Sequence, residues 1–425
     1  MKGFFLLVEI ALPILAIYWI VRKQSLAIVY IPFIMFSYHI IDTRLPGFFQ
    51  FFISAGLLGY LVIFNLPFVR QNPLSIIIFL YFLFLMKNVE VEFNSIRPYL
   101  INVSWLFLGI GLIPHIFKKY PREKVFLELS SAAFLVMLIF CINTGFSTVF
   151  KYNPRAIYGI TTGVLFGNIS NDYYNIFPLA LFLILRKGIQ DKNVLYLGVY
   201  FISIFLVLLT LRRTVMVLSL VGTVLVMVEL LDFQKIKQFL AYGIITLLIT
   251  IVVISNTSFV PQLIERYEER DLDNRELENE GRLMEFDIIY KDLFFYYDYD
   301  PWFGYRLEDS KGNYGKKIFG ERSLHTDFAN LIHSAGILGL FLYLMMVLIA
   351  FYAVWRRIAN KDDFLQFLFI GICFAAYFIT GRYTTSNAML MMFAILNLPM
   401  AKNINSKRNL IIAPKTNSEP NMRSS

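Results

Sequence analysis

The sequence is poor in charged residues and in cysteine. Only 16% of its 425 residues are charged, whereas soluble domains average about a quarter. Hydrophobic residues make up 57%, and the mean hydropathy is +0.61. So few charges cannot cover a globular surface in water, which indicates that lipid surrounds most of the chain. The two cysteines, Cys141 and Cys373, both lie inside apolar runs, so the sequence indicates neither a disulfide framework nor a metal cluster.

The positive net charge of +9 does not indicate a nucleic-acid partner. Lys and Arg residues lie mainly in short loops between apolar runs, which is the pattern of membrane topology rather than of a basic binding surface. We therefore expect the lipid bilayer, and no nucleic acid, among the partners of this protein.

Long apolar runs fill most of the chain. A spanning helix needs about 20 mostly apolar residues, and lipid-exposed backbone has to be hydrogen-bonded within its own segment. The predicted fold class is therefore all-α, a polytopic membrane protein of twelve to fourteen spans, with thirteen as the best single interpretation. The expected spans are 3–21, 26–41, 47–66, 74–89, 98–117, 125–142, 169–185, 194–211, 214–231, 236–254, 326–355, 364–380 and 386–401.

Residues 1–400 are expected to form one transmembrane domain, whose first span is retained because no small-residue cleavage site follows it. Placing 232–237 inside and alternating from there puts twenty Lys and Arg residues inside and nine in the short outer segments. This asymmetry predicts that the long loop 255–325 lies outside the cytoplasm. The polar segment 401–425 is expected to be a disordered cytoplasmic tail.

The long loop carries ten basic and sixteen acidic residues and begins with a charge-dense block. A second stretch repeats apolar residues at helical spacing, which predicts an amphipathic helix lying at the outer membrane interface. The residues of that apolar stripe are Leu283, Phe286, Tyr290, Leu293 and Tyr297.

Polar groups at the outer ends of spans cost several kcal/mol unless they are used or paired. Three polar clusters lie on the expected outer side, two of them at span ends and the second in the long loop. The first is Thr210-Leu-Arg-Arg213. The second is Gly281-Arg282, followed by Pro301-Trp-Phe-Gly304. The third is His325-Thr-Asp-Phe328, followed by Ala335-Gly-Ile-Leu-Gly339.

In this order the clusters resemble the O-antigen polymerase and ligase family (Wzy-type polymerases and WaaL-type ligases). The resemblance covers roughly residues 150–400 and is most specific in the His325 motif. An earlier loop with Arg155 also looks like that family's Arg-containing loop. Two positions depart from the family pattern: Thr326 stands where Asn is usual, and Arg212 stands where Ser is usual. Arg213, followed by Thr, fits the family's key Arg better than Arg212 does.

The resemblance implies a GT-C-like fold and glycosyl transfer from undecaprenyl-pyrophosphate-linked oligosaccharides, without metal or cofactor. It implies that pyrophosphate binds to Arg213, Arg282, Arg155 and Arg212, and that His325 is the catalytic base. The residue types suit these roles. The planar guanidinium of Arg donates two parallel hydrogen bonds to phosphate, and an imidazole can accept a hydroxyl proton near neutral pH.

Each of these residues also has a plainer interpretation. His325 could be an interfacial polar tip, and Arg212 or Arg213 a snorkelling anchor at a span end. Arg282 could pair with Glu280 or Glu285 on a solvated helix, and Arg155 could be an ordinary exposed loop residue. His333 is expected to be structural and deeper in the membrane on the same helix as His325. Both Asp-x-Asp sequences, 271–273 and 298–300, are expected to be incidental.

The expected function is polymerisation of lipid-linked repeat units into surface polysaccharide, such as O-antigen, capsule or exopolysaccharide, at the outer face of a bacterial cytoplasmic membrane. A chain-length regulator is left open as a partner. The near alternative is a ligase of the same family, which moves the glycan to lipid A core or protein. The distant alternative is a flippase or transporter, which should show charged residues along many spans and internal repeats.

Overall fold

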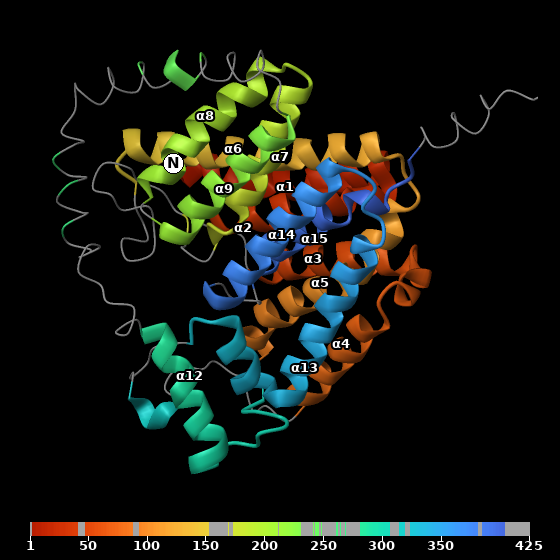
Figure 1. Ribbon diagram of the computed structural model, residues 1–425, viewed down its shortest axis with the longest axis vertical. Helices are drawn as coiled ribbons and strands as arrows, with labels where there is room; N and C mark the ends of the chain where they lie inside the picture. Colours follow the sequence, from red (N-terminus) through yellow and green to blue (C-terminus); the bar gives the residue numbers. More distant parts are fainter. Residues whose placement is uncertain are drawn as a thin grey trace, which may run out of the picture.

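The computed structural model forms helices and no strand within the residues that it describes (Figure 1). The described residues are 2–40, 47–87, 93–152, 169, 173–210, 212–230, 281–306, 314–318, 324–380 and 385–403, with isolated positions between 241 and 268. The expectation of an all-α protein is confirmed for this part of the chain.

The helices follow the apolar runs. The first half holds α1 (Lys2–Lys23), a 3₁₀ helix (Gln24–Tyr30), α2 (Ile31–Ile40), α3 (Gly47–Ile63), a 3₁₀ helix (Leu66–Arg70), α4 (Pro73–Met86), α5 (Phe93–Phe117), α6 (Arg122–Val149), α7 (Ile176–Gln190), α8 (Val194–Leu209) and α9 (Arg213–Glu229). The second half holds α12 (Gly281–Lys291), a π-helix (Asp292–Tyr296), a 3₁₀ helix (Gly315–Lys317), α13 (Asp327–Trp355), α14 (Lys361–Thr380), α15 (Ser386–Leu396) and a 3₁₀ helix (Leu398–Met400).

Four of the described helices are long and apolar enough to cross a membrane: α5 over Arg97–Phe117, α6, α13 and α14. Several long apolar helices indicate a membrane protein, but helix length does not confirm twelve to fourteen spans. Helices α3, α4, α8 and α15 are apolar and shorter. The expected span 26–41 divides into a 3₁₀ helix and α2, whose ten residues extend about 15 Å, half the thickness of a bilayer core. The expected span 236–254 lies outside the described residues, apart from a few isolated positions.

The core of the bundle is built around α7 and α15, which are buried on every side. Helix α7 packs against α6, α8, α9 and α15, while α15 also contacts α2, α5 and α14. Residues 176–185 of α7 and 388–396 of α15 are apolar around the whole circumference, as a central helix has to be. Aromatic rings join these layers: Phe177 of α7 lies 4.3 Å from Phe140 of α6 and 5.6 Å from Phe36 of α2, between ring centroids.

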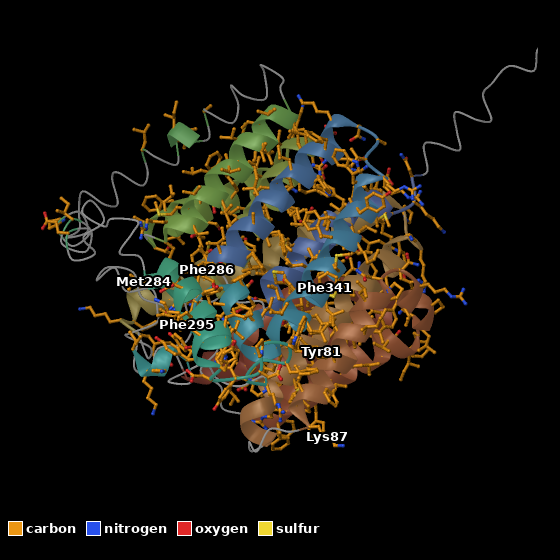
Figure 2. The ribbon with its side chains drawn as sticks, turned by 60° about the horizontal axis from the view of Figure 1, so that its bottom comes forward. Tyr81, Lys87, Met284, Phe286, Phe295 and Phe341 are labelled. Carbon is orange, nitrogen blue, oxygen red and sulfur yellow. The ribbon has the colours of Figure 1, made fainter. Side chains whose placement is uncertain are left out.

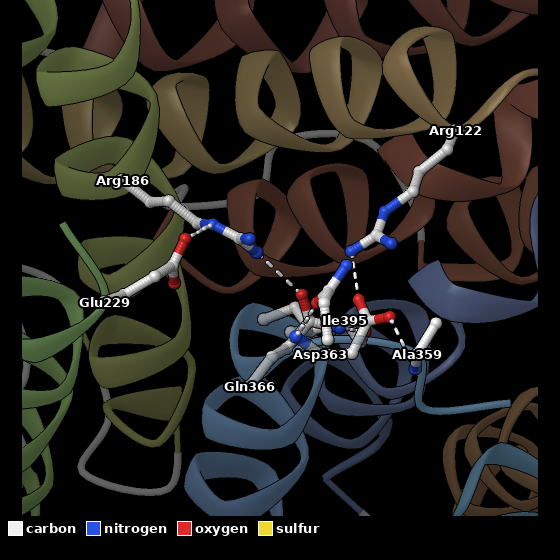
Figure 3. Close-up of polar contacts among 8 residues, drawn as sticks. Arg122, Arg186, Glu229, Ala359, Asp363, Gln366 and Ile395 are labelled. Atoms are coloured by element: carbon white, nitrogen blue, oxygen red, sulfur yellow. Dashed lines mark hydrogen bonds and ion pairs between the residues drawn. The ribbon is translucent and has the colours of Figure 1, made fainter. Parts of the chain in front are cut away.

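Ion pairs and hydrogen bonds join the ends of several helices, and Figure 3 shows those made by Arg186 and Arg122. Arg186 of α7 bonds to Glu229 of α9 at 2.7 Å and to Gln366 of α14 at 2.8 Å. Arg122 of α6 pairs with Asp363 of α14. Because charged groups buried between helices are stable only when they are paired, these contacts fix the helix ends against one another.

Further basic residues lie at the same end, which we call the basic end. Lys23 bonds to Glu128 at 2.5 Å, and Lys119 bonds to Asn65 at 2.6 Å. The backbone of Lys402, after α15, pairs with that of Tyr120. All the basic residues in these contacts belong to the twenty assigned to one side by charge, so the structure brings those loops together. The rest of the expected tail, from residue 404 on, lies outside the described residues.

A second, smaller core lies at the opposite end, which we call the loop end. It contains α12 and lies at the bottom of Figure 1, against the start of α13. The buried residues of this core are Ile288, Ile289, Leu293, Tyr299, Tyr314, Leu324, Ala329 and Ile332. The described part of the long loop is therefore a packed unit attached to the bundle.

Candidate functional site

Helix α13 is broken at Gly336, which has φ 66° and ψ −173°. Phe328 and Tyr343 lie on either side of the break, and their ring centroids lie 6.2 and 6.5 Å from that of Phe378 in α14. In an unbroken helix the two residues would be about 22 Å apart along the axis. The two segments therefore fold back on each other at Gly336. This bend explains why the expected span 326–355 is longer than a bilayer requires.

The Pro301–Gly304 turn clasps this break. An interrupted helix leaves backbone N–H and C=O groups without partners. Here Ile337 N donates to the carbonyl of Pro301 at 2.9 Å, and Tyr305 N donates to the carbonyl of His333 at 2.6 Å. The turn thus bonds to both halves of α13. Two motifs that lie apart in the sequence, Pro-x-x-Gly and Gly-x-x-Gly, are parts of one structure.

Glycine is required on both sides of this contact. A Cβ on Gly336 would lie 2.2 Å from the carbonyl oxygen of Trp302. A Cβ on Gly304, whose φ is +68°, would lie 2.6 Å from the backbone N of Gly336. Positive φ and backbone contact this close both exclude larger residues. Tyr81 of α4 completes the clasp, because its hydroxyl donates to the carbonyl of Ala335 at 2.7 Å.

His333 is buried, as expected, but its expected position is wrong. Because α13 folds back, His333 lies next to the loop rather than deeper in the bundle. Its ring centroid is 5.0 Å from Tyr299, 5.3 Å from Tyr305 and 6.3 Å from Tyr314. Desolvation by burial, with Asp292 nearby, raises the pKa of Tyr299. His333 therefore packs the loop unit against α13, and its replacement would disturb the loop.

His325 lies immediately before α13, at the other end of the first segment. Thr326 is the N-cap, and its Oγ1 accepts a hydrogen bond from the backbone N of Ala329 at 3.1 Å. The helix therefore begins at Asp327, within one residue of the expected start of the span 326–355. The His325 side chain is 33% exposed, so a substrate could reach it.

Glu285 of α12 holds His325. Its Oε1 lies 3.0 Å from His325 Nδ1, and its Oε2 accepts hydrogen bonds from the backbone N of His325 at 2.9 Å and of Thr326 at 3.4 Å. The carboxylate is fully buried. The sequence offered Glu285 only as one of two carboxylates that could pair with Arg282. Its contact with His325 was missed because forty residues separate the two.

Helix α12 buries a different stripe from the one expected. The contact face of α12 and of the π-helix that continues it is formed by Glu285, Ile288, Ile289 and Asp292, each no more than 7% exposed. Of the expected stripe, Leu293 is buried, whereas Tyr290 and Tyr297 are 60% and 70% exposed. The reason is that α12 packs against the start of α13, and that neighbour selects the face. Met284, Phe286 and Phe295 lie together on this loop unit in Figure 2, and Tyr81 and Phe341 lie on the adjoining bundle.

Arg212 lies at the same end of the bundle as His325. Its guanidinium is 5.8 Å from the ring centroid of Tyr174, just before α7. The next carbonyl, of Asn175, accepts a hydrogen bond from Tyr377 of α14 at 2.5 Å. The residue after Tyr377 contacts the first turn of α13, as described above. A short series of contacts thus connects Arg212 to the first turn of α13, which His325 precedes.

The structure describes the three other predicted arginines to different extents. Arg213 is the first residue of α9 and is exposed. Arg282 belongs to the first turn of α12, three residues before Glu285, and its side chain lies outside the description. Arg155 lies outside the described residues altogether.

The second Asp-x-Asp sequence has a structural use. Asp300 Oδ1 accepts hydrogen bonds from the backbone N of Trp302 at 2.7 Å and of Phe303 at 3.0 Å, which shapes the turn that clasps α13. The first, 271–273, lies outside the described residues. Among the residues that the structure describes, no three His, Cys, Asp or Glu side chains gather as metal ligands would.

Comparison with known proteins adds no family assignment: no family model and no curated protein matches the sequence. Function is therefore inferred from the residues of the loop end.

Proposed function

We propose that this protein is a membrane glycosyltransferase that polymerises lipid-linked oligosaccharide repeat units into surface polysaccharide. One observation carries the proposal. The imidazole of His325 is partly exposed at the start of α13, and the buried carboxylate of Glu285 holds it there. A partly exposed histidine that a buried carboxylate orients is the arrangement of a general base.

The proposed reaction uses that base on a sugar hydroxyl. The acceptor hydroxyl oxygen attacks the anomeric carbon of the donor, and the bond from that carbon to the pyrophosphate oxygen breaks. The hydroxyl proton passes to His325, and undecaprenyl pyrophosphate leaves with the electron pair of the broken bond. General-base assistance of this kind contributes about 10²–10⁴ in rate.

The leaving pyrophosphate needs cations, which the proposal assigns to arginine. Arg213 and Arg212 begin α9 at the loop end, and Arg282 belongs to the first turn of the helix that carries Glu285. Their planar forks suit phosphate oxygens, and the N-terminus of α9 adds its partial positive charge. Arg155 is kept as a fourth candidate on the resemblance alone.

The proposal places the loop end on the outer side of a bacterial cytoplasmic membrane, in a GT-C-like fold, with a chain-length regulator as a further partner. A ligase is the near alternative, because its chemistry differs only in the acceptor. A flippase is less well supported, since the ion pairs between the described helices of the bundle lie near helix ends rather than along the helices.

The test is a reconstituted assay. The purified protein in liposomes is given undecaprenyl-pyrophosphate-linked repeat units as both donor and acceptor. A ladder of chains that grow by one repeat unit supports a polymerase. Transfer only after lipid A core or an acceptor protein is added would indicate a ligase. Movement of the lipid across the bilayer with no new glycosidic bond would contradict both enzymes.

A further inference from the structure

We propose that Glu285 is a positioning residue, which fixes His325 in the tautomer that a base requires. This inference rests on the proposed function for its catalytic meaning, but the contacts that carry it are independent of any substrate. They join a residue of the long loop to the start of α13.

The backbone of α13 fixes which way the carboxylate faces. Oε2 of Glu285 accepts hydrogen bonds from the backbone N–H groups of His325 and Thr326, which precede the helix. Helix N-termini stabilise negative charge, and an ionised carboxylate can only accept hydrogen bonds. With Oε2 held by the backbone, Oε1 is left facing His325 Nδ1 at 3.0 Å.

An acceptor opposite Nδ1 requires the proton to be on Nδ1. The neutral imidazole then carries its lone pair on Nε2, so proton exchange with a substrate has to use Nε2. When Nε2 takes the proton, the imidazolium charge forms next to the buried carboxylate. Glu285 therefore orients the ring, selects the basic nitrogen and stabilises the protonated product.

Glu285→Gln should reverse the tautomer. A glutamine has one carbonyl oxygen and one NH₂ group. If the oxygen keeps the backbone N–H groups, the NH₂ faces Nδ1 and needs it as an acceptor, which moves the ring proton to Nε2. The matched control is Asp287→Asn on the same helix, because Asp287 is exposed and bonds to Lys291 at 2.5 Å, not to His325.

The structural test uses nitrogen-15 NMR of histidine-labelled protein, in which the chain's four histidines are few enough to assign with a His325→Gln variant. We expect Nδ1–H in the wild type and in Asp287→Asn, and Nε2–H in Glu285→Gln. Nε2–H in the wild type, or the same tautomer in Glu285→Gln as in the wild type, would overturn the inference.

The activity test is separate. In the reconstituted assay Glu285→Gln should slow chain growth about 10²–10⁴-fold, the range for a lost general base. Glu285→Asp should keep part of the rate, and Asp287→Asn all of it. A reversed tautomer with normal chain growth would leave the positioning role of Glu285 standing and remove His325 from the proposed reaction.

Discussion

Arg212 and Arg213 are adjacent, but the structure gives them different surroundings. Arg212 lies over the ring of Tyr174 and is half-buried, whereas Arg213 begins α9 and is exposed. A cation over an aromatic face is partly engaged by the protein itself. Arg213 is the more exposed of the two, and this, with its fit to the sequence motif, makes it the better candidate to bind a substrate anion.

Arg213→Lys should weaken use of the lipid-linked donor by about 10- to 100-fold, because Lys keeps the charge but loses the paired hydrogen bonds, worth about 1.5–3 kcal/mol. The measurement is the KM for donor in the reconstituted assay. Arg22→Lys is the control, since Arg22 is an exposed arginine in the last turn of α1 at the basic end. An unchanged KM in Arg213→Lys, with a loss in Arg213→Ala, would mean that charge alone matters.

Local sequence predicted some of these residues and not others. The start of α13 was predicted to within one residue, because the apolar run that follows it and the capping Thr326 are local features of the sequence. Glu285 could not be assigned to His325, because only the packing of α12 on α13 brings them together. His333 was placed wrongly because a straight α13 was assumed.

At the scale of elements, the bend in α13 positions the site. It turns the first segment back along α14, so that His325 lies at the loop end beside the bundle. The bend depends on one residue, Gly336, and on the turn that clasps it. The turn therefore links the loop unit to the longer segment of α13 that follows Gly336.

Gly336→Ala should destabilise the protein by about 3 kcal/mol or more, because positive φ costs about 1–3 kcal/mol and the new Cβ would overlap the backbone of Trp302. Gly371→Ala in α14 is the matched control, since nothing lies within 4 Å of its Cβ position. It should be neutral or stabilising by up to about 1 kcal/mol. Thermal unfolding in detergent measures both. Equal unfolding temperatures would show that the clasp contributes little.

Periodicity predicted that α12 exists but not its buried face. A helical repeat shows that one stripe is apolar, whereas the contact face depends on the neighbour. Here the neighbour is α13, and the buried stripe includes two carboxylates, Glu285 and Asp292, which apolar periodicity cannot reveal.

At the scale of the whole molecule, the two ends of the bundle differ in chemistry. The basic end holds ion pairs between helix ends, and the loop end holds a second core with aromatic and acidic residues. Composition predicted a helical membrane protein, and most apolar runs became helices. The expected number of spans stays a prediction, because several of the described apolar helices are shorter than a bilayer crossing requires.

The asymmetry predicts the orientation of the chain. A reporter fused at Asn274 should be outside and one fused at Asn360 inside, because twenty basic residues lie in the segments assigned inside and nine in the short outer ones. Alkaline phosphatase and green fluorescent protein fusions report the two sides. The reverse result would place the loop end in the cytoplasm, away from the expected donor.

The most direct measurement of the central claim is chain growth by His325→Ala in the reconstituted assay, with His115→Ala, on α5 at the basic end, as the control. The account predicts that His325→Ala makes no ladder but still binds the lipid-linked donor, because the arginines bind pyrophosphate while the base acts only as the hydroxyl attacks. His115→Ala should form the same ladder as the wild type. Normal chain growth by His325→Ala would contradict the assignment of His325 as the base.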